Sequence, residues 1–177
     1  ISELVAILPM FSISLVLALS CYLVLKSGEI SFGQQAFFGV GAYSGGILTA
    51  MFDWSLTAAL AASAIAAAAV AAAIGLSLCR ISGFRFTLMT LVLGEFAKEV
   101  FAKIEWRRVA NGQAVGPEGP LGFSGIEYYY NSGIHYPMQG LIVVSVATGC
   151  LVAVWFYGRS GPGQRLAAVA SDATLAA

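Results

Sequence analysis

Long apolar runs alternate with short polar breaks along the chain. Three runs of 20 residues or more contain no charged residue, and a fourth has 18 residues without a charge. A helix needs about 20 apolar residues to cross the hydrocarbon core of a bilayer. The pattern therefore predicts membrane-spanning helices over residues 4–25, 34–52, 54–79 and 138–157.

A further helix is predicted over residues 86–104, and its character changes along its length. It begins with the apolar FTLMTLVLG and continues with charges interleaved among apolar positions. Glu95 with Lys98, and Glu99 with Lys103, are spaced to form favourable helical pairs. We expect this helix to start as a membrane span and then to leave the hydrocarbon or line a water-filled cavity. The predicted fold is an all-α, polytopic transmembrane helix bundle with about five spans in one domain, residues 1–177.

The distribution of basic residues orients the predicted spans. With five crossings, one side holds five basic residues and the other holds three. Cytoplasmic connections are enriched in lysine and arginine. Residues 105–137, a glycine- and proline-rich loop with several tyrosines, are therefore expected outside the cell. The basic residues of the cytoplasmic side are Lys26, Arg80, Arg85, Arg159 and Arg165, and those of the outer side are Lys103, Arg107 and Arg108.

Composition agrees with a membrane protein and excludes several functions. Of the 177 residues, 59% are hydrophobic and 10% are charged, against about a quarter charged in globular domains. The net charge of zero argues against nucleic-acid binding. The three cysteines lie in apolar runs, where they are expected to be buried, and His135 stands without partner ligands, so no metal site is predicted. No catalytic motif occurs, so the chain is not expected to be an enzyme.

The segment GEISFGQQAFFGVGAYSGG, residues 28–46, combines glycines with polar residues at the start of a predicted span. Its small residues fall in two rows at helical spacing, which allow neighbouring backbones to approach closely. Ser31, Gln34 and Gln35 gather at the helix start, either because Ser31 caps the helix or because this end faces a substrate. The two rows are Gly41, Gly45 and Thr49, and Gly39, Ala42, Gly46 and Ala50.

This segment resembles the G-x-x-S-x-G-Q-x-x-F-x-G-x-G-A-Y motif of branched-chain amino acid ABC transporter permeases, the LivH/LivM family. FRFTLMTLVLGEFAKEVF is similar to the segment of that family in which a Thr-Leu pair, here Thr90 and Leu91, precedes a glutamate, here Glu95. WRRVANGQAVGPEGP resembles its outer loop, and residues 158–177 resemble its cytoplasmic, ATPase-docking segment. The motif positions matched in the first segment are Gly28, Ser31, Gly33, Gln34, Phe37, Gly39, Gly41, Ala42 and Tyr43.

The resemblance implies a permease subunit of an ABC importer in a bacterial inner membrane, with substrate passing by alternating access. Its partners would be ATP-binding subunits, a second permease subunit and an extracytoplasmic substrate-binding protein. The chain itself would bind no cofactor, because the partner subunits use the ATP. Further spans are expected beyond this chain, which would be a fragment. The implied translocation residues are Ser31, Gly33, Gln34, Tyr43, Thr90 and Glu95; the helix-packing residues are Gly39, Gly41, Gly45 and Gly46; and the ATPase-docking residues are Gly163, Arg165, Leu166, Ala168 and Asp172.

Two other functions fit the same residues. An ATP-independent channel or secondary transporter for a small polar solute such as urea could use residues 28–46 as a broken helix. A structural membrane subunit could use the glycines for packing alone.

Overall fold

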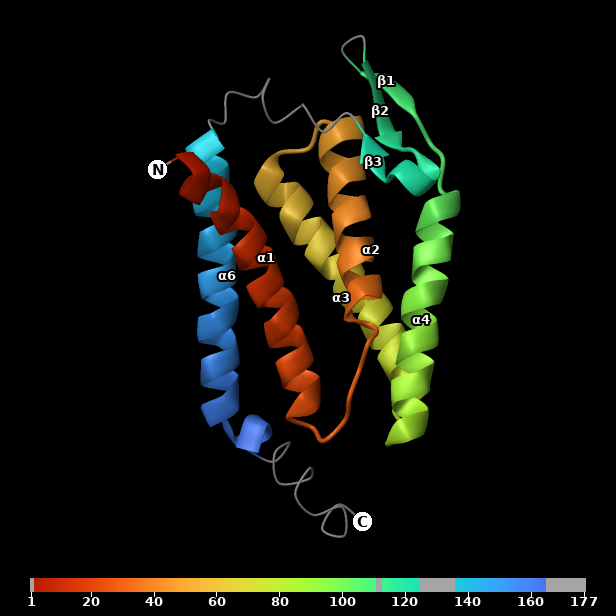
Figure 1. The fold of residues 1–177 in the computed structure, drawn as a ribbon, viewed down its shortest axis with the longest axis vertical. Coiled ribbons are helices and arrows are strands. Elements are labelled where there is room, and N and C mark those ends of the chain that lie inside the picture. Colours follow the sequence, from red (N-terminus) through yellow and green to blue (C-terminus); the bar gives the residue numbers. More distant parts are fainter. Residues whose placement is uncertain (1, 111–112, 125–135, 165–177) are drawn as a thin grey trace. The chain divides into compact units, whose positions relative to one another are not determined.

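The computed structural model describes residues 2–110, 113–124 and 136–164 (Figure 1). The chain divides into two compact units: residues 1–31 together with 134–177, and residues 32–133. The first unit contains the helices α1, Ser2–Leu25, and α6, Tyr136–Arg159. The second contains three helices and a small sheet.

In the first unit, α1 and α6 lie side by side and run in the same direction (Figure 1). A Cβ added to Gly140 near the start of α6 would lie 3.9 Å from Cγ of Pro9. At the other end, the Lys26 ammonium lies 3.4 Å from the Gly158 carbonyl oxygen. Both helices are apolar, and most of their surface is exposed. A helix that is apolar all round requires an apolar environment, which a bilayer provides.

In the second unit, α2, Gln34–Gly46, continues directly into a π-helical turn, η1, Ile47–Met51. Asp53 then takes a positive φ of 53° and ends the helical run. The helix α3, Leu56–Leu78, runs back antiparallel to α2, and α4, Phe84–Lys103, returns in the direction of α2 (Figure 1). All five predicted helices are therefore present within a few residues of their predicted bounds.

Three of the five helices, α1, α3 and α6, are long and apolar enough to cross a membrane. The other two fall at the positions of the remaining predicted spans. The run of α2 and η1 is interrupted by its π turn, and α4 carries the charges noted above. That these two helices also cross the bilayer remains a prediction.

The small residues of α2 face different neighbours. A Cβ at Gly41 would lie 3.8 Å from Cβ of Ala67, and one at Gly45 would lie 3.5 Å from Oγ of Ser63, both on α3. Gly39 instead lies against the ring of Phe101 on α4, where an added Cβ would come within 2.4 Å of Cε2. One row of small residues thus lets α3 approach, and the other leaves room for an aromatic ring.

A three-stranded antiparallel sheet lies within the predicted outer loop. Its strands are β1, Arg108–Ala110, β2, Gln113–Pro117, and β3, Phe123–Ser124, in the order β1-β2-β3. A 3-10 turn, η2, Gly119–Leu121, connects the last two strands. The strands are short, and β2 contains glycine and proline, so they lack the alternating pattern that predicts a strand. Composition alone therefore indicated only a loop.

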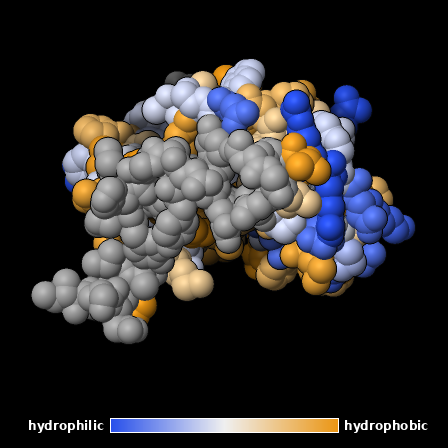
Figure 2. Space-filling model, turned by 90° about the horizontal axis from the view of Figure 1, so that it is seen from above, coloured by the Kyte–Doolittle hydropathy of each residue, from blue (hydrophilic) through white to orange (hydrophobic). Residues whose placement is uncertain are grey.

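The sheet is fixed to the end of α2. The Arg108 guanidinium donates a 2.9 Å hydrogen bond to the carbonyl of Met51, the last residue of η1. Arg107 and Glu118 form an ion pair beside it. In the view onto this end of the second unit, hydrophilic residues gather on the side where the sheet lies (Figure 2). This polar cap agrees with a segment that lies outside the hydrocarbon.

Three local predictions differ from the structure. Gly33, rather than Ser31, occupies the N-cap position of α2. Cys21 and Cys79 are exposed on their helices, and Cys150 is partly exposed, because single helices leave most of their surface uncovered. The pair Glu95–Lys98 forms, whereas no ion pair joins Glu99 and Lys103, both of which are described.

Candidate functional site

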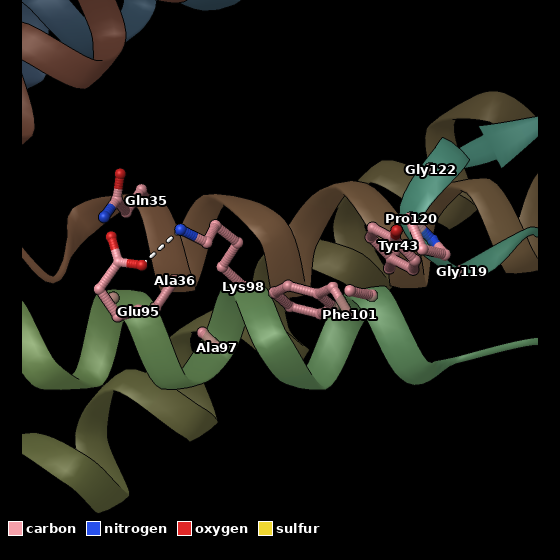
Figure 3. A pocket seen from close by; sticks show the side chains of 12 residues that line it. Gln35, Ala36, Tyr43, Glu95, Ala97, Lys98, Phe101, Gly119, Pro120 and Gly122 are labelled. Atoms are coloured by element: carbon pink, nitrogen blue, oxygen red, sulfur yellow. Dashed lines mark hydrogen bonds and ion pairs between the residues drawn. The ribbon is translucent and has the colours of Figure 1, made fainter.

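A groove of about 330 Å³ lies between α2 and α4, under the η2 turn, and is the candidate site (Figure 3). This volume is at the lower end of the range for small-molecule sites, which is about 300–1,000 Å³. The groove lies entirely within the second unit. Its lining residues are Gln35, Ala36, Tyr43, Gly94, Glu95, Ala97, Lys98, Phe101, Ala102, Gly119, Pro120 and Gly122.

One end of the groove is charged. Glu95 and Lys98, one turn apart on α4, form an ion pair, and Gln35 of α2 lies beside them (Figure 3). The two charged side chains are 59% and 66% exposed, respectively. An exposed helical ion pair of this kind contributes little to stability, so another charged group can replace either partner at little cost. This end therefore offers both signs of charge to a ligand.

The other end of the groove is aromatic. Tyr43 of α2 stacks on Phe101 of α4 with ring centroids 4.7 Å apart and planes at 22°. Phe123 of β3 packs against Tyr43 in a T-shaped arrangement, with centroids 6.2 Å apart and planes at 82°. Gly119 and Pro120 of η2 close this end (Figure 3). The turn between β2 and β3 thus covers the apolar part of the site.

Close contacts hold the start of α2 against α4. The buried hydroxyl of Thr90 accepts a 3.2 Å hydrogen bond from the Phe32 backbone N–H. A Cβ at Gly33 would lie 3.5 Å from Cβ of Thr90, and one at Gly94 would lie 2.6 Å from Nε2 of Gln35. A side chain at position 94 would displace the Gln35 amide and come within 3.2 Å of the Phe32 carbonyl oxygen.

Gln34, the first residue of α2, is 8% exposed. Its side-chain oxygen Oε1 is buried and finds no hydrogen-bond partner among the described residues. An unsatisfied buried polar atom costs about 1–3 kcal/mol of stability. Packing alone does not account for a glutamine at this position.

The structure brings some of the predicted translocation residues together and separates others. Tyr43 and Glu95 line the groove, and Thr90 with Gly33 supports the crossing next to it. Gln34 is buried outside the groove lining, and Ser31 belongs to the first unit. Lys98, Phe101 and Gly94 were not predicted as site residues from the sequence. The spacing within the helix had indicated Lys98 only as an ion-pair partner of Glu95. Gly39 lies behind the Phe101 ring.

Most of the predicted ATPase-docking segment, including Arg165, Leu166, Ala168 and Asp172, falls outside the described residues. Gly163 is described and lies in a helical turn over residues 161–164. A Cβ there would lie 2.0 Å from the Tyr157 carbonyl oxygen, so this position accepts only glycine without rearrangement. Among the described residues, no three potential metal ligands come together.

The family to which the chain belongs follows from comparison with family models. A model described as branched-chain amino acid transport system / permease component matches residues 3–177. No curated protein and no solved structure matches the chain. The match extends over both units and includes the groove and the three apolar helices long enough to span a bilayer. The chain is therefore a multi-pass membrane protein that belongs to the family of permease components of branched-chain amino acid transport systems.

Proposed function

We propose that the chain is the membrane-spanning permease subunit of an ATP-driven ABC importer, and that the groove between α2 and α4 receives a branched-chain or related small amino acid. The observation that carries the proposal is the pairing of a charged end with an aromatic end in one groove. A free amino acid carries both charges at one carbon and, in this class, a small apolar side chain at the other end. The arrangement of the groove is complementary to that distribution.

The exposed charges support a wet or ligand-filled groove. A charged side chain that faces hydrocarbon costs about 2.5–3.5 kcal/mol even on insertion scales. Glu95 and Lys98 lie on the groove side of α4, whereas Val92 and Phe96 on the same helix are exposed apolar residues. Water, substrate or protein must therefore cover the charged face, while lipid suits the apolar one.

Alternating access requires the substrate to be held differently in two states, because a ligand shifts an equilibrium only by its difference in affinity. In our proposal ATP-binding partners drive that change, and the segment 158–177 receives their motion. An extracytoplasmic binding protein delivers the substrate, and a second permease subunit completes the path. The chain binds no cofactor itself.

Transport assays with and without partners test this assignment. Membrane vesicles that contain the chain with a second permease subunit, the ATP-binding subunits and the binding protein should take up leucine only when ATP is supplied inside. Vesicles with the chain but without ATP-binding subunits should show no uptake above protein-free vesicles. Uptake that persists without any ATPase would instead identify an ATP-independent channel or secondary transporter, for which urea is the second solute to test.

The charged end of the groove makes a separate prediction. Glu95→Gln and Lys98→Gln should each lower leucine uptake about tenfold to a hundredfold, since each change removes a charge-assisted hydrogen bond to one charged group of the substrate. Initial uptake rates over a range of leucine concentrations measure the effect. Glu99→Gln, an equal change at an exposed position outside the groove lining, is the control and should leave uptake unchanged.

The exchanged double variant Glu95→Lys/Lys98→Glu separates ligand binding from helix stability. It restores an ion pair on α4 but reverses the charges presented to the ligand. Because the aromatic end fixes the direction of the substrate, we expect the exchange to leave uptake low. Restored uptake would show that the pair serves only the helix.

A further inference from the structure

A second cavity, of about 360 Å³, lies in the first unit between the C-terminal ends of α1 and α6. Four aliphatic residues form its walls. Its cationic residues, Lys26 and Arg159, stand at the helix ends, just beyond Leu25 and at the last residue of α6. The aliphatic residues are Leu19, Leu23, Leu151 and Val154. The cavity is thus apolar along the helices and basic at one end.

Two aromatic residues lie at the basic end of the cavity. The guanidinium carbon of Arg159 lies 3.9 Å from the centroid of the Trp155 ring. Tyr22 and Trp155 both line the cavity and are about half exposed. Tryptophan and tyrosine prefer the level of the lipid headgroups, where one end of the side chain meets water. The cavity therefore reaches the membrane interface at its basic end.

Neither cation is neutralised within the described part of the chain. Lys26 donates a long hydrogen bond to the Gly158 carbonyl, and no described carboxylate pairs with either side chain. An arginine held over an aromatic ring still has N–H groups that can donate to an anion. The dipoles of α1 and α6 place about half a negative charge at each C-terminal end. The full positive charges of Lys26 and Arg159 exceed this, so the end of the cavity keeps a net positive charge.

We propose that this cavity binds an anionic phospholipid. Its phosphate accepts hydrogen bonds from Lys26 and Arg159, and one acyl chain lies along the aliphatic walls. A zwitterionic lipid fits less well, because its own ammonium group is repelled by the two cations. A water-soluble phosphate compound leaves the apolar walls uncovered. Basic pockets between transmembrane helices are suited to anionic headgroups in this way.

Quenching of Trp155 by brominated lipids tests the proposal. With Trp54→Phe and Trp106→Phe, Trp155 is the only tryptophan of the 177 residues. The full chain is reconstituted into vesicles of dibrominated phosphatidylglycerol or dibrominated phosphatidylcholine, each mixed with its unbrominated form. The quenching curves give the relative affinity for the two lipids next to Trp155. Two basic residues at about 1 kcal/mol each predict a preference of up to about thirtyfold for phosphatidylglycerol.

The double change Lys26→Gln/Arg159→Gln should reduce this preference to near one. The preference is the ratio of the affinities for the two lipids, both measured in the same variant. Removal of Arg159 can change the emission of Trp155, but this change affects both measurements equally and does not alter the ratio. Arg80→Gln/Arg85→Gln removes the same charge at another basic cavity and should retain the preference. Equal quenching by both lipids in the unsubstituted single-tryptophan protein, or equal losses in the two double variants, would overturn the proposal.

Soluble glycerol 3-phosphate distinguishes a lipid from a free phosphate. A preference that persists at millimolar glycerol 3-phosphate supports a ligand held by its acyl chains. A preference that disappears would show that the basic end recognises free phosphate, which contradicts the assignment to lipid.

Discussion

Replacing Gly39 by alanine is expected to lower the stability of the protein by about 1–3 kcal/mol and to abolish transport, because the added methyl group overpacks the crossing of α2 and α4. The new Cβ would lie 2.4 Å from Cε2 of Phe101 and 3.0 Å from Cζ. The ring cannot move aside freely, since it stacks on Tyr43. Either the ring enters the groove or α4 moves away from α2, and both outcomes destroy the aromatic end of the site.

Gly41→Ala is the matched control for this prediction. It makes the same change two residues along the same helix, where the nearest atom would be 3.8 Å away, an ordinary contact. Alanine is a better helix former than glycine by about 1 kcal/mol, so the control should be neutral or stabilising. Thermal unfolding midpoints in one detergent, together with leucine uptake, measure both variants. Equal midpoints for the two would show that the Phe101 ring has room to accommodate the methyl group.

Replacing Gln34 by leucine is expected to separate stability from transport. Oε1 of Gln34 is buried without a partner among the described residues, so an apolar side chain of similar size removes a polar atom that opposes folding. The unfolding midpoint should stay the same or rise, by an amount that corresponds to about 1–3 kcal/mol at most. Leucine uptake should fall to the background of protein-free vesicles, because we expect this oxygen to accept a hydrogen bond from water or substrate during transport.

Thr49→Val provides the comparison for Gln34→Leu. Thr49 is also a buried polar residue of the α2–η1 run, but its hydroxyl is satisfied by a 2.8 Å hydrogen bond to the Gly45 carbonyl. Its replacement should cost about 1 kcal/mol and leave transport intact. If Gln34→Leu instead lowers the midpoint while uptake continues, Gln34 serves folding alone and has no part in the path.

The helices could be predicted from the sequence because each is encoded locally. An uncharged run of sufficient length predicts a span wherever it occurs, and the structure places α1, α3 and α6 within about two residues of the runs that predict them. The sheet could not be predicted in this way. Its pairing of Arg108 with Val115 and of Pro117 with Phe123 depends on contacts between segments whose own pattern indicates a turn.

The candidate site was predictable in part. Tyr43 and Glu95 stand in motifs that pointed to them, and both line the groove. Phe101 and Gly94 belong to the site because of the way in which α2 crosses α4. The residue spacing within either helix does not predict that crossing. The neighbours of the glycines could not be predicted either. Their spacing indicated close packing, but it did not indicate that Gly39 faces the Phe101 ring or that Gly41 faces Ala67.

The π turn at the end of α2 has a consequence for how this chain aligns with other members of its family. A turn closed by bonds from i to i+5 holds one residue more than an α-helical turn. The segment Ile47–Met51 therefore contains an extra residue, and it ends at Met51, whose carbonyl accepts the hydrogen bond from Arg108. A family member in which α2 continues as a regular α-helix should be one residue shorter here, with the gap falling between Gly46 and Asp53.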